Sequence, residues 1–258
     1  MNYLFRGLFG AYALLICLAM LPVGTLMIIA TPGLGNRRRM AKWLARVLLG
    51  LLGAGPRIEG LPGLPNGACV VVANHCSYLD GVLLKAVLPP RFSFVIKKEA
   101  RRIPMGGFML HRLGSEFVTR DNDHAGARDA RRILRAAAEG QALGFFPEGT
   151  FMPEPGLRPF RLGAFLTAAR AGLPVIPIAI HGSRRMLPSG SWLPRPGRLS
   201  VKILAAITPT GNDRDAAMLL RDQARRQILA NIDEPDLAGG SETQGTNPRR
   251  ELSARPDL

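Results

Sequence analysis

Thirty consecutive residues near the N-terminus, residues 7–36, carry no charged side chain. This length exceeds the roughly 20 apolar residues that cross a lipid bilayer. It also exceeds the apolar core of a signal peptide, which has about 7–15 residues. The segment is therefore expected either to span the membrane once or to break at Pro22 into a helical hairpin that dips into one leaflet, because proline removes a backbone donor.

Basic residues follow this segment directly. Residues 37–52 begin with three arginines and carry apolar side chains at helical spacing. We expect an amphipathic helix whose cations lie on anionic lipid head groups, each worth about 1 kcal/mol near the surface; a basic core helix is the alternative. Its apolar face would comprise Trp43, Leu44, Val47, Leu48, Leu51 and Leu52. The excess of cations after the apolar segment predicts an inner-membrane protein whose remaining chain lies in the cytoplasm.

The whole chain is strongly basic, with 34 Lys and Arg against 19 Asp and Glu and a formal charge of +15. Such a balance indicates a polyanionic partner: nucleic acid, an anionic membrane surface or a phosphorylated substrate. The adjacent apolar segment favours the membrane surface, so nucleic acid is not the expected partner. The three cysteines show no spacing typical of a disulfide framework or a zinc site, so no metal is expected.

From residue 68 onward, short β-rich runs alternate with helical patterns, which predicts an α/β fold with a mixed, largely buried sheet flanked by helices. The strands are expected at residues 68–73, 92–97, 115–119, 142–146, 174–181 and 199–205, and the helices at 81–88, 104–112, 124–139, 161–171 and 214–230. The expected organisation is a membrane anchor at 1–56, a catalytic domain at 57–232 and a disordered polar tail at 233–258, which lacks aromatic residues.

A histidine leaves the first of these strands with a carboxylate five residues later, in the run Asn74-His75-Cys-Ser-Tyr-Leu-Asp80. If the loop folds back, Asp80 can bind one ring nitrogen of His75, fix its tautomer and make the other nitrogen a better base. Such a pair corresponds to the base and the orienting carboxylate of a catalytic triad, without a nucleophile from the protein. Cys76 is poorly placed as a nucleophile, because adjacent residues of an extended segment point to opposite faces.

Three further segments stand in order behind this one. Residues 114–120 read G-S-E-F-V-T-R, residues 145–150 read F-F-P-E-G-T and residues 173–178 read L-P-V-I-P-I. Together with N-H-x-x-x-x-D they resemble the four motifs of the glycerolipid acyltransferase family, of the bacterial 1-acyl-glycerol-3-phosphate acyltransferase type. The resemblance covers about residues 60–206, and the N-terminal segments look like the family's two-helix membrane anchor.

The resemblance implies that His75 is the general base, that Asp80 orients it, and that a lysolipid hydroxyl attacks an acyl thioester directly. The acyl donor would be acyl-CoA or acyl carrier protein, and no cofactor is implied. Asn74 would hold the loop, Arg120 and Lys97 would bind the acceptor's phosphate, and Lys98 could substitute for Lys97. The remaining substrate-binding residues implied are Gly114, Phe117, Pro147, Glu148, Gly149 and Thr150.

One position departs from the family pattern. The third motif usually ends in arginine, which helps to hold the acceptor's phosphate, but Phe151 stands there. Arg158 or Arg161 could substitute. Another acceptor, such as a lysophospholipid or an ornithine-type lysolipid, is therefore an alternative to 1-acyl-glycerol-3-phosphate. A membrane-tethered binding protein and a lipid ester or thioester hydrolase are alternatives of other classes.

Overall fold

The computed structural model describes residues 3–119 and 123–238 of the chain. In this part, seven strands form one sheet in the order β1-β7-β6-β2-β5-β3-β4. Their bounds are β1 Arg57–Glu59, β2 Val70–Ala73, β3 Ser93–Lys97, β4 Glu116–Val118, β5 Leu143–Phe145, β6 Val175–His181 and β7 Ser200–Ile203. All neighbours run parallel except β6 and β7, which are antiparallel. The predicted mixed α/β sheet is confirmed; the edge strand β1 was not predicted, because its three residues are exposed and show no apolar run.

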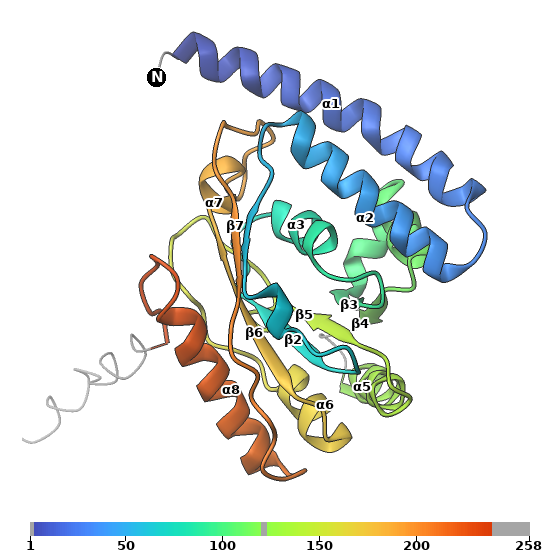
Figure 1. Cartoon of the computed structure of the whole chain (residues 1–258), viewed down its shortest axis with the longest axis vertical. Coiled ribbons are helices and arrows are strands. Elements are labelled where there is room, and N and C mark those ends of the chain that lie inside the picture. The colour runs from blue at the N-terminus through green and yellow to red at the C-terminus, as the bar shows by residue number, and fades with distance from the viewer. Residues whose placement is uncertain (1–2, 120–122, 239–258) are drawn as a thin grey trace, which may run out of the picture.

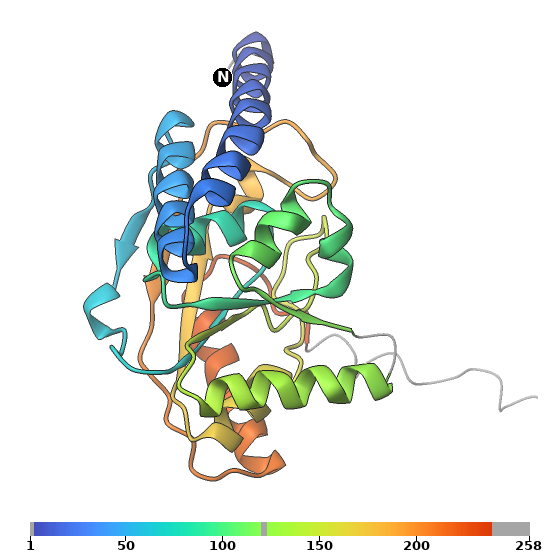
Figure 2. The ribbon, with the colours of Figure 1, turned by 90° about the vertical axis from the view of Figure 1, so that its right-hand side faces the viewer.

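Helices cover both faces of the sheet (Figures 1 and 2). Their bounds are α1 Tyr3–Ala30, α2 Leu34–Leu51, α3 Leu79–Val87, α4 Gly106–Arg112, α5 Asp123–Ala138, α6 Gly163–Ala171, α7 Ser183–Met186 and α8 Arg214–Leu229, with 3-10 turns η1 Leu61–Gly63 and η2 Lys98–Arg102. Strand β2 is buried on both sides because its side chains alternate: Val71 and Ala73 pack toward α2 and α3, while Val70 and Val72 pack toward α6 and α8.

Of the two expected geometries, the break at Pro22 is wrong, because α1 continues through this proline to Ala30. The chain reverses later, at residues 31–33, where Gly33 takes φ +77°, and α2 then runs back beside α1 (Figure 1). A proline removes one intrahelical hydrogen bond. Here the helix stays continuous, because the other hydrogen bonds of this long helix and its packing on α2 remain. In the described part of the chain, α1 is the one helix long and apolar enough to cross a membrane.

Three cations of α2 bind backbone carbonyls of the domain. The guanidinium of Arg38 is buried and donates to the carbonyls of Leu113, Arg91 and Gly114 at 3.0–3.2 Å. Lys42 donates to the carbonyls of Val87 and Leu88, and Arg46 donates to that of Ala86. The carbonyls of residues 86–88 lie at the C-terminal end of α3, where they have no partner within the helix. Lys42 and Arg46 therefore cap α3, and their positive charges interact favourably with its dipole. The expectation that this row of cations faces the membrane is wrong for Arg38 and Lys42, which are buried and half-buried, whereas Arg39 and Arg46 are exposed.

The predicted apolar face of α2 is correct only in part. Leu44 and Leu52 are buried, but Trp43 and Leu51 are exposed, at 53% and 44%. The reason is the row of inward cations, which takes the face toward α3 and turns Trp43 outward.

The disordered tail was expected to start at residue 233, but residues 233–238 are held against the domain. We call them the C-terminal strap. Glu234 forms an ion pair with Arg184 at 2.7 Å and accepts from the Gly156 N–H at 2.8 Å. The backbone of Leu237 donates to the carbonyl of Leu157. These long-range polar contacts supply the ordering that the strap's composition does not, and residues 239–258 lie outside the described part of the chain.

Candidate active site

The loop between β2 and α3 brings His75 and Asp80 together as the spacing predicted. Nδ1 of His75 lies 2.9 Å from Oδ2 of Asp80, at the carboxyl end of a central buried strand. The same carboxylate oxygen accepts from the backbone N–H groups of Cys76 and Ser77 at 2.7 and 2.8 Å. The carboxylate is fully buried, and charge-assisted hydrogen bonds of this kind are strong. Asp80 therefore fixes both the loop and the orientation of the imidazole.

Cys76 is not an alternative nucleophile. Its Sγ is buried and lies 3.1 Å from Oγ of Ser183. Burial, together with the nearby carboxylate of Asp80, raises the pKa of the Cys76 thiol to about 12. A thiol with such a pKa carries almost no thiolate at neutral pH. His75 therefore remains the candidate catalytic side chain of this loop.

Glu148, expected to contact the acceptor, joins two loops. Its Oε1 accepts from the backbone N–H of His75 at 2.7 Å, and its Oε2 accepts from that of Arg158 at 2.9 Å. The side chain is 5% exposed. Burial raises the pKa of Glu148 to about 7, and the two N–H donors only partly offset this effect. No sequence pattern predicts these bonds, because their donors are backbone groups, one of them 73 residues away in the chain.

Asn74 also holds backbone. Its amide nitrogen donates to the carbonyl of Ile180 at 3.0 Å, and its amide oxygen accepts from the Ile180 N–H at 2.8 Å. The side chain is buried, so both polar ends are occupied by β6. These bonds are consistent with the expectation that Asn74 holds the loop. Both polar ends of the side chain are used in them, so neither is directed at a substrate.

The other residues of the F-F-P-E-G-T segment form the turn after β5. Pro147 is buried, Gly149 takes φ +80°, a left-handed conformation that favours glycine, and Thr150 is exposed. Lys97 is exposed at the end of β3 and lies 3.7 Å from Glu99. Among the described members of the predicted substrate-binding set, Thr150 and Lys97 are the exposed ones.

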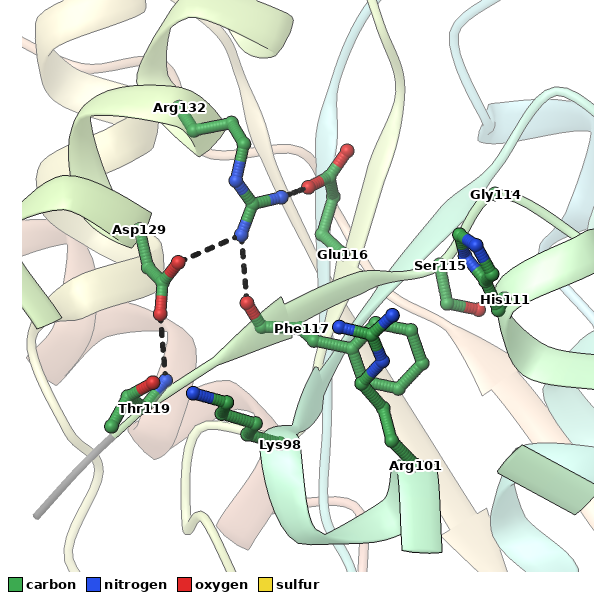
Figure 3. A pocket seen from close by; sticks show the side chains of 10 residues that line it. All are labelled: Lys98, Arg101, His111, Gly114, Ser115, Glu116, Phe117, Thr119, Asp129 and Arg132. Atoms are coloured by element: carbon green, nitrogen blue, oxygen red, sulfur yellow. Dashed lines mark hydrogen bonds and ion pairs between the residues drawn. The ribbon is translucent and has the colours of Figure 1, made fainter. Parts of the chain in front are cut away.

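A basic cleft of about 460 Å³ opens along the edge strand β4 (Figure 3). Its cations are Lys98 and Arg101 from η2 and Arg132 from α5. Arg132 is bound to Glu116, to Asp129 and to the carbonyl of Phe117, which covers the unpaired edge of the strand. Lys98 extends into the opening (Figure 3).

Two predicted ligand residues of the G-S-E-F-V-T-R segment line this cleft but have packing roles. The ring of Phe117 is 9% exposed and lies under the guanidinium of Arg101, 5.1 Å away. Gly114 takes φ +68°, and a Cβ there would lie 3.0 Å from Nη2 of Arg38, so this glycine admits the anchor helix α2. Arg120, the expected phosphate ligand, lies outside the described residues.

Comparison with known proteins identifies the family. Residues 55–181 match the family described as Acyltransferase. A 1-acyl-sn-glycerol-3-phosphate acyltransferase of Neisseria meningitidis is 30% identical, and the match covers 79% of this chain and 85% of that protein. The chain belongs to the glycerolipid acyltransferase family.

Another relative is matched over a smaller share of its own length. The 1-acyl-sn-glycerol-3-phosphate acyltransferase CHLREDRAFT_174358 of Chlamydomonas reinhardtii is 34% identical over 71% of this chain, which covers 53% of that protein. The chain thus spans about half of that relative. The crystal structure of the 1-acyl-sn-glycerophosphate (LPA) acyltransferase, PlsC, from Thermotoga maritima matches with a TM-score of 0.73 and 21% identity over 90% of this chain and 98% of that one. This likeness shows the acyltransferase fold.

The departure from the family pattern, Phe151, lies in direct contact with His75. The two ring centroids are 4.5 Å apart, and Tyr78 meets Phe151 edge-on at 4.8 Å. The ring of Phe146 stacks on the imidazole at 4.1 Å. Sequence reasoning singled out Phe151 only as the absence of an arginine and did not predict this aromatic group.

The described residues contain no group of three or more His, Cys, Asp or Glu side chains that could hold a metal ion. A second cavity of about 180 Å³ is lined mainly by apolar side chains, among them Val95, Ile133 and Phe145. Phe146 lines it and also stacks on His75, so the cavity adjoins the imidazole through one ring.

Proposed function

We propose that the protein transfers a fatty acyl group from an acyl thioester to the free hydroxyl of a lysolipid, with 1-acyl-glycerol-3-phosphate as the acceptor and phosphatidic acid as the product. The observation that carries this proposal is the pair His75 and Asp80, 2.9 Å apart. Relatives at 30–34% identity bear the name 1-acyl-sn-glycerol-3-phosphate acyltransferase, which supports the acceptor.

In the proposed reaction, Asp80 holds the proton on Nδ1 of His75, so that Nε2 is free to accept one. Nε2 takes the proton of the acceptor hydroxyl as its oxygen attacks the thioester carbonyl. The C–S bond then breaks, and the leaving thiolate takes the proton back from the imidazolium. Asp80 stabilises that imidazolium, and no acyl-enzyme forms. Positioning both substrates at one base supplies further acceleration.

The acceptor's phosphate is proposed to bind between the ends of β3 and β4. Lys97 is exposed there, and Lys98 and Arg101 border the basic cleft. Ammonium and guanidinium groups suit a phosphate dianion. The donor is proposed to be acyl-CoA or acyl-acyl carrier protein, whose thioester needs no metal or redox cofactor.

The protein is proposed to lie on the cytoplasmic face of the inner membrane through α1, with the helix in one leaflet rather than across it. Its outward side chains are large, apolar and exposed: Tyr3, Leu4, Phe5, Leu8, Tyr12, Leu15, Leu18, Leu21, Val23, Leu26 and Ile29. The helix contacts the catalytic domain near both ends, at Gly10 beside Leu193 and at Ile28 beside Leu113. A helix held along the domain at both ends supports the in-plane arrangement.

A second acceptor class is favoured by one observation. Phe151 occupies the position of the family's arginine and lies against His75, so that position offers an apolar ring where a cation would bind phosphate. A lysolipid with another head group, such as a lysophospholipid or an ornithine-type lysolipid, would suit this surface.

The test is to incubate purified protein with one labelled acyl thioester and a panel of lysolipids. We expect labelled phosphatidic acid from 1-acyl-glycerol-3-phosphate, and we expect His75→Ala to abolish it while the variant still folds and sediments with anionic vesicles. A product from another lysolipid only would favour the second class. Appreciable transfer by His75→Ala would show that His75 is not the base.

A further inference from the structure

The imidazole of His75 is enclosed by aromatic side chains. Phe146 stacks on it with an interplanar angle of 19°, and Phe151 meets it at 66°. Tyr78 packs edge-on against Phe151 and is itself 62% exposed, so the aromatic group reaches the surface. Only 18% of the His75 side chain remains exposed. We call Phe151 and Tyr78 the aromatic cover.

The cover is held in place by polar contacts on the loop that carries Phe151. Nη1 of Arg184 donates to the carbonyl of Met152, the next residue, at 2.8 Å. The N–H groups of Arg158 and Gly156 donate to Glu148 and Glu234. A loop tied at several points along its length presents its aromatic ring in one place.

A base with a free nitrogen does not by itself distinguish a lysolipid hydroxyl from water. If Nε2 takes a proton from water, the oxygen of that water attacks the thioester carbonyl, the C–S bond breaks, and the thiolate leaves with the proton. The products are a free fatty acid and a thiol. Selective transfer therefore requires that water be kept from Nε2 until the acceptor is bound.

An aromatic ring suits this requirement. Nδ1 is occupied by Asp80, and rings lie against the imidazole, so water has little room and few hydrogen-bonding partners beside the base. An arginine at position 151 would bring its own hydration and five donors to the same place. The phenylalanine brings an apolar surface.

We propose that Phe151, backed by Tyr78, is a positioning residue that excludes water from His75 and commits the thioester to transfer rather than hydrolysis. This inference rests on the proposed acyl transfer. The residue at position 151 would then act on the fate of the acyl group instead of on the acceptor's phosphate.

The experiment measures two products from one labelled acyl-CoA in the presence of saturating 1-acyl-glycerol-3-phosphate: free fatty acid and diacyl product. Phe151→Ala is expected to raise the ratio of hydrolysis to transfer by about two- to tenfold, the rate equivalent of one aromatic contact. Phe151→Tyr keeps the ring and is expected to restore the wild-type ratio. Phe151→Leu keeps an apolar side chain without a ring and is expected to give an intermediate ratio.

Met152→Ala is the matched control, since it removes an exposed apolar side chain from the adjacent position and leaves the backbone carbonyl that binds Arg184. It should leave the ratio unchanged. Should Phe151→Ala not fold, Phe151→Leu decides, because it retains most of the buried volume. An unchanged ratio in folded Phe151→Ala or Phe151→Leu, or an equal rise in Met152→Ala, would overturn the inference. Absence of diacyl product from wild type with every lysolipid would instead overturn the proposed function.

Discussion

The backbone N–H of His75 donates to Oε1 of Glu148 at 2.7 Å, across 73 residues of sequence. The other oxygen of this buried carboxylate binds the N–H of Arg158. Glu148 thereby fixes the position of the base relative to the loop that carries Phe151. The two loops that form the active site are joined through one side chain.

Replacement of this carboxylate by an amide should loosen both loops. In Glu148→Gln, one oxygen becomes an NH2 group, which cannot accept from either backbone N–H. We expect a loss of about 1–3 kcal/mol in the free energy of unfolding at pH 5, from a buried donor left without a partner. We also expect reduced acyl transfer, because His75 is displaced. Urea unfolding and the transfer assay measure the two effects, and a fully active variant of wild-type stability would contradict this role.

The same variant should change how stability depends on pH. The folded pKa of Glu148 is about 7, above its ordinary value of 4.5. A raised pKa means that the carboxyl's contribution is fully present below about 4.5 and is lost as the pH rises through about 7. Wild type should therefore lose about 3 kcal/mol relative to Glu148→Gln across this window. Parallel unfolding curves for the two proteins from pH 4.5 to 7.5 would contradict it.

Asp80→Asn should cost both stability and activity. Oδ2 of Asp80 accepts hydrogen bonds from the backbone N–H groups of Cys76 and Ser77 and from the ring of His75. A neutral amide oxygen accepts such bonds more weakly than a carboxylate oxygen. We expect a loss of about 1–3 kcal/mol in unfolding free energy, the difference between charged and neutral hydrogen bonds at several donors. Transfer should fall by at least about 100-fold, since the base loses its counter-charge. A stable variant with wild-type transfer would show that the charge of Asp80 is dispensable.

Arg38→Met should weaken the attachment of the anchor helices to the domain. The variant leaves the carbonyls of Leu113 and Arg91 without the buried guanidinium that now binds them. We expect a loss of about 2–4 kcal/mol, from charged hydrogen bonds broken in a buried setting. Arg39→Met, on the exposed side of the same helix, is the control and should change stability by less than about 0.5 kcal/mol. Equal stabilities of the two variants would refute the role assigned to Arg38.

Lys85→Met should stabilise the protein at neutral pH. Burial, with smaller contributions from Arg38 and Lys42, lowers the pKa of Lys85 to about 8 from 10.5. A lowered lysine pKa means that the charged form is disfavoured in the fold, so stability is lost as the pH falls through about 8. Removing this cation should raise the unfolding free energy by about 1–3 kcal/mol at pH 7, and the gain should shrink toward pH 10. Lys202→Met, at an exposed position of β7, should show no such gain.

The sequence predicts the parts of this protein that depend on local pattern. The buried run before Asn74 and the five-residue spacing from His75 to Asp80 are sufficient to place a strand, a loop and an imidazole–carboxylate pair, because all the contacts involved are close in the chain. Alternation of the remaining β-rich and helical runs gives the other strands within two residues. The short exposed strand β1 has no such pattern.

The contacts that the sequence does not predict join distant segments. Glu148 binds backbone, and backbone partners leave no trace in residue identity. The cations of α2 recur every four residues, at Arg38, Lys42 and Arg46. This spacing predicts that they share one face of the helix, but it does not predict whether that face contacts lipid or protein. Pro22 is a similar case, because α1 continues through it and the packing of that helix on α2 cannot be predicted from the proline alone.

The C-terminal strap has a consequence for the time at which the active site is completed. The chain is synthesised from its N-terminus, so α1 is available to meet a membrane long before Glu234 leaves the ribosome. Until then Arg184 lacks its carboxylate partner, and the Gly156 N–H lacks its acceptor. The loop that presents Phe151 to His75 is thus secured last, after the helices and strands that carry the base have been synthesised.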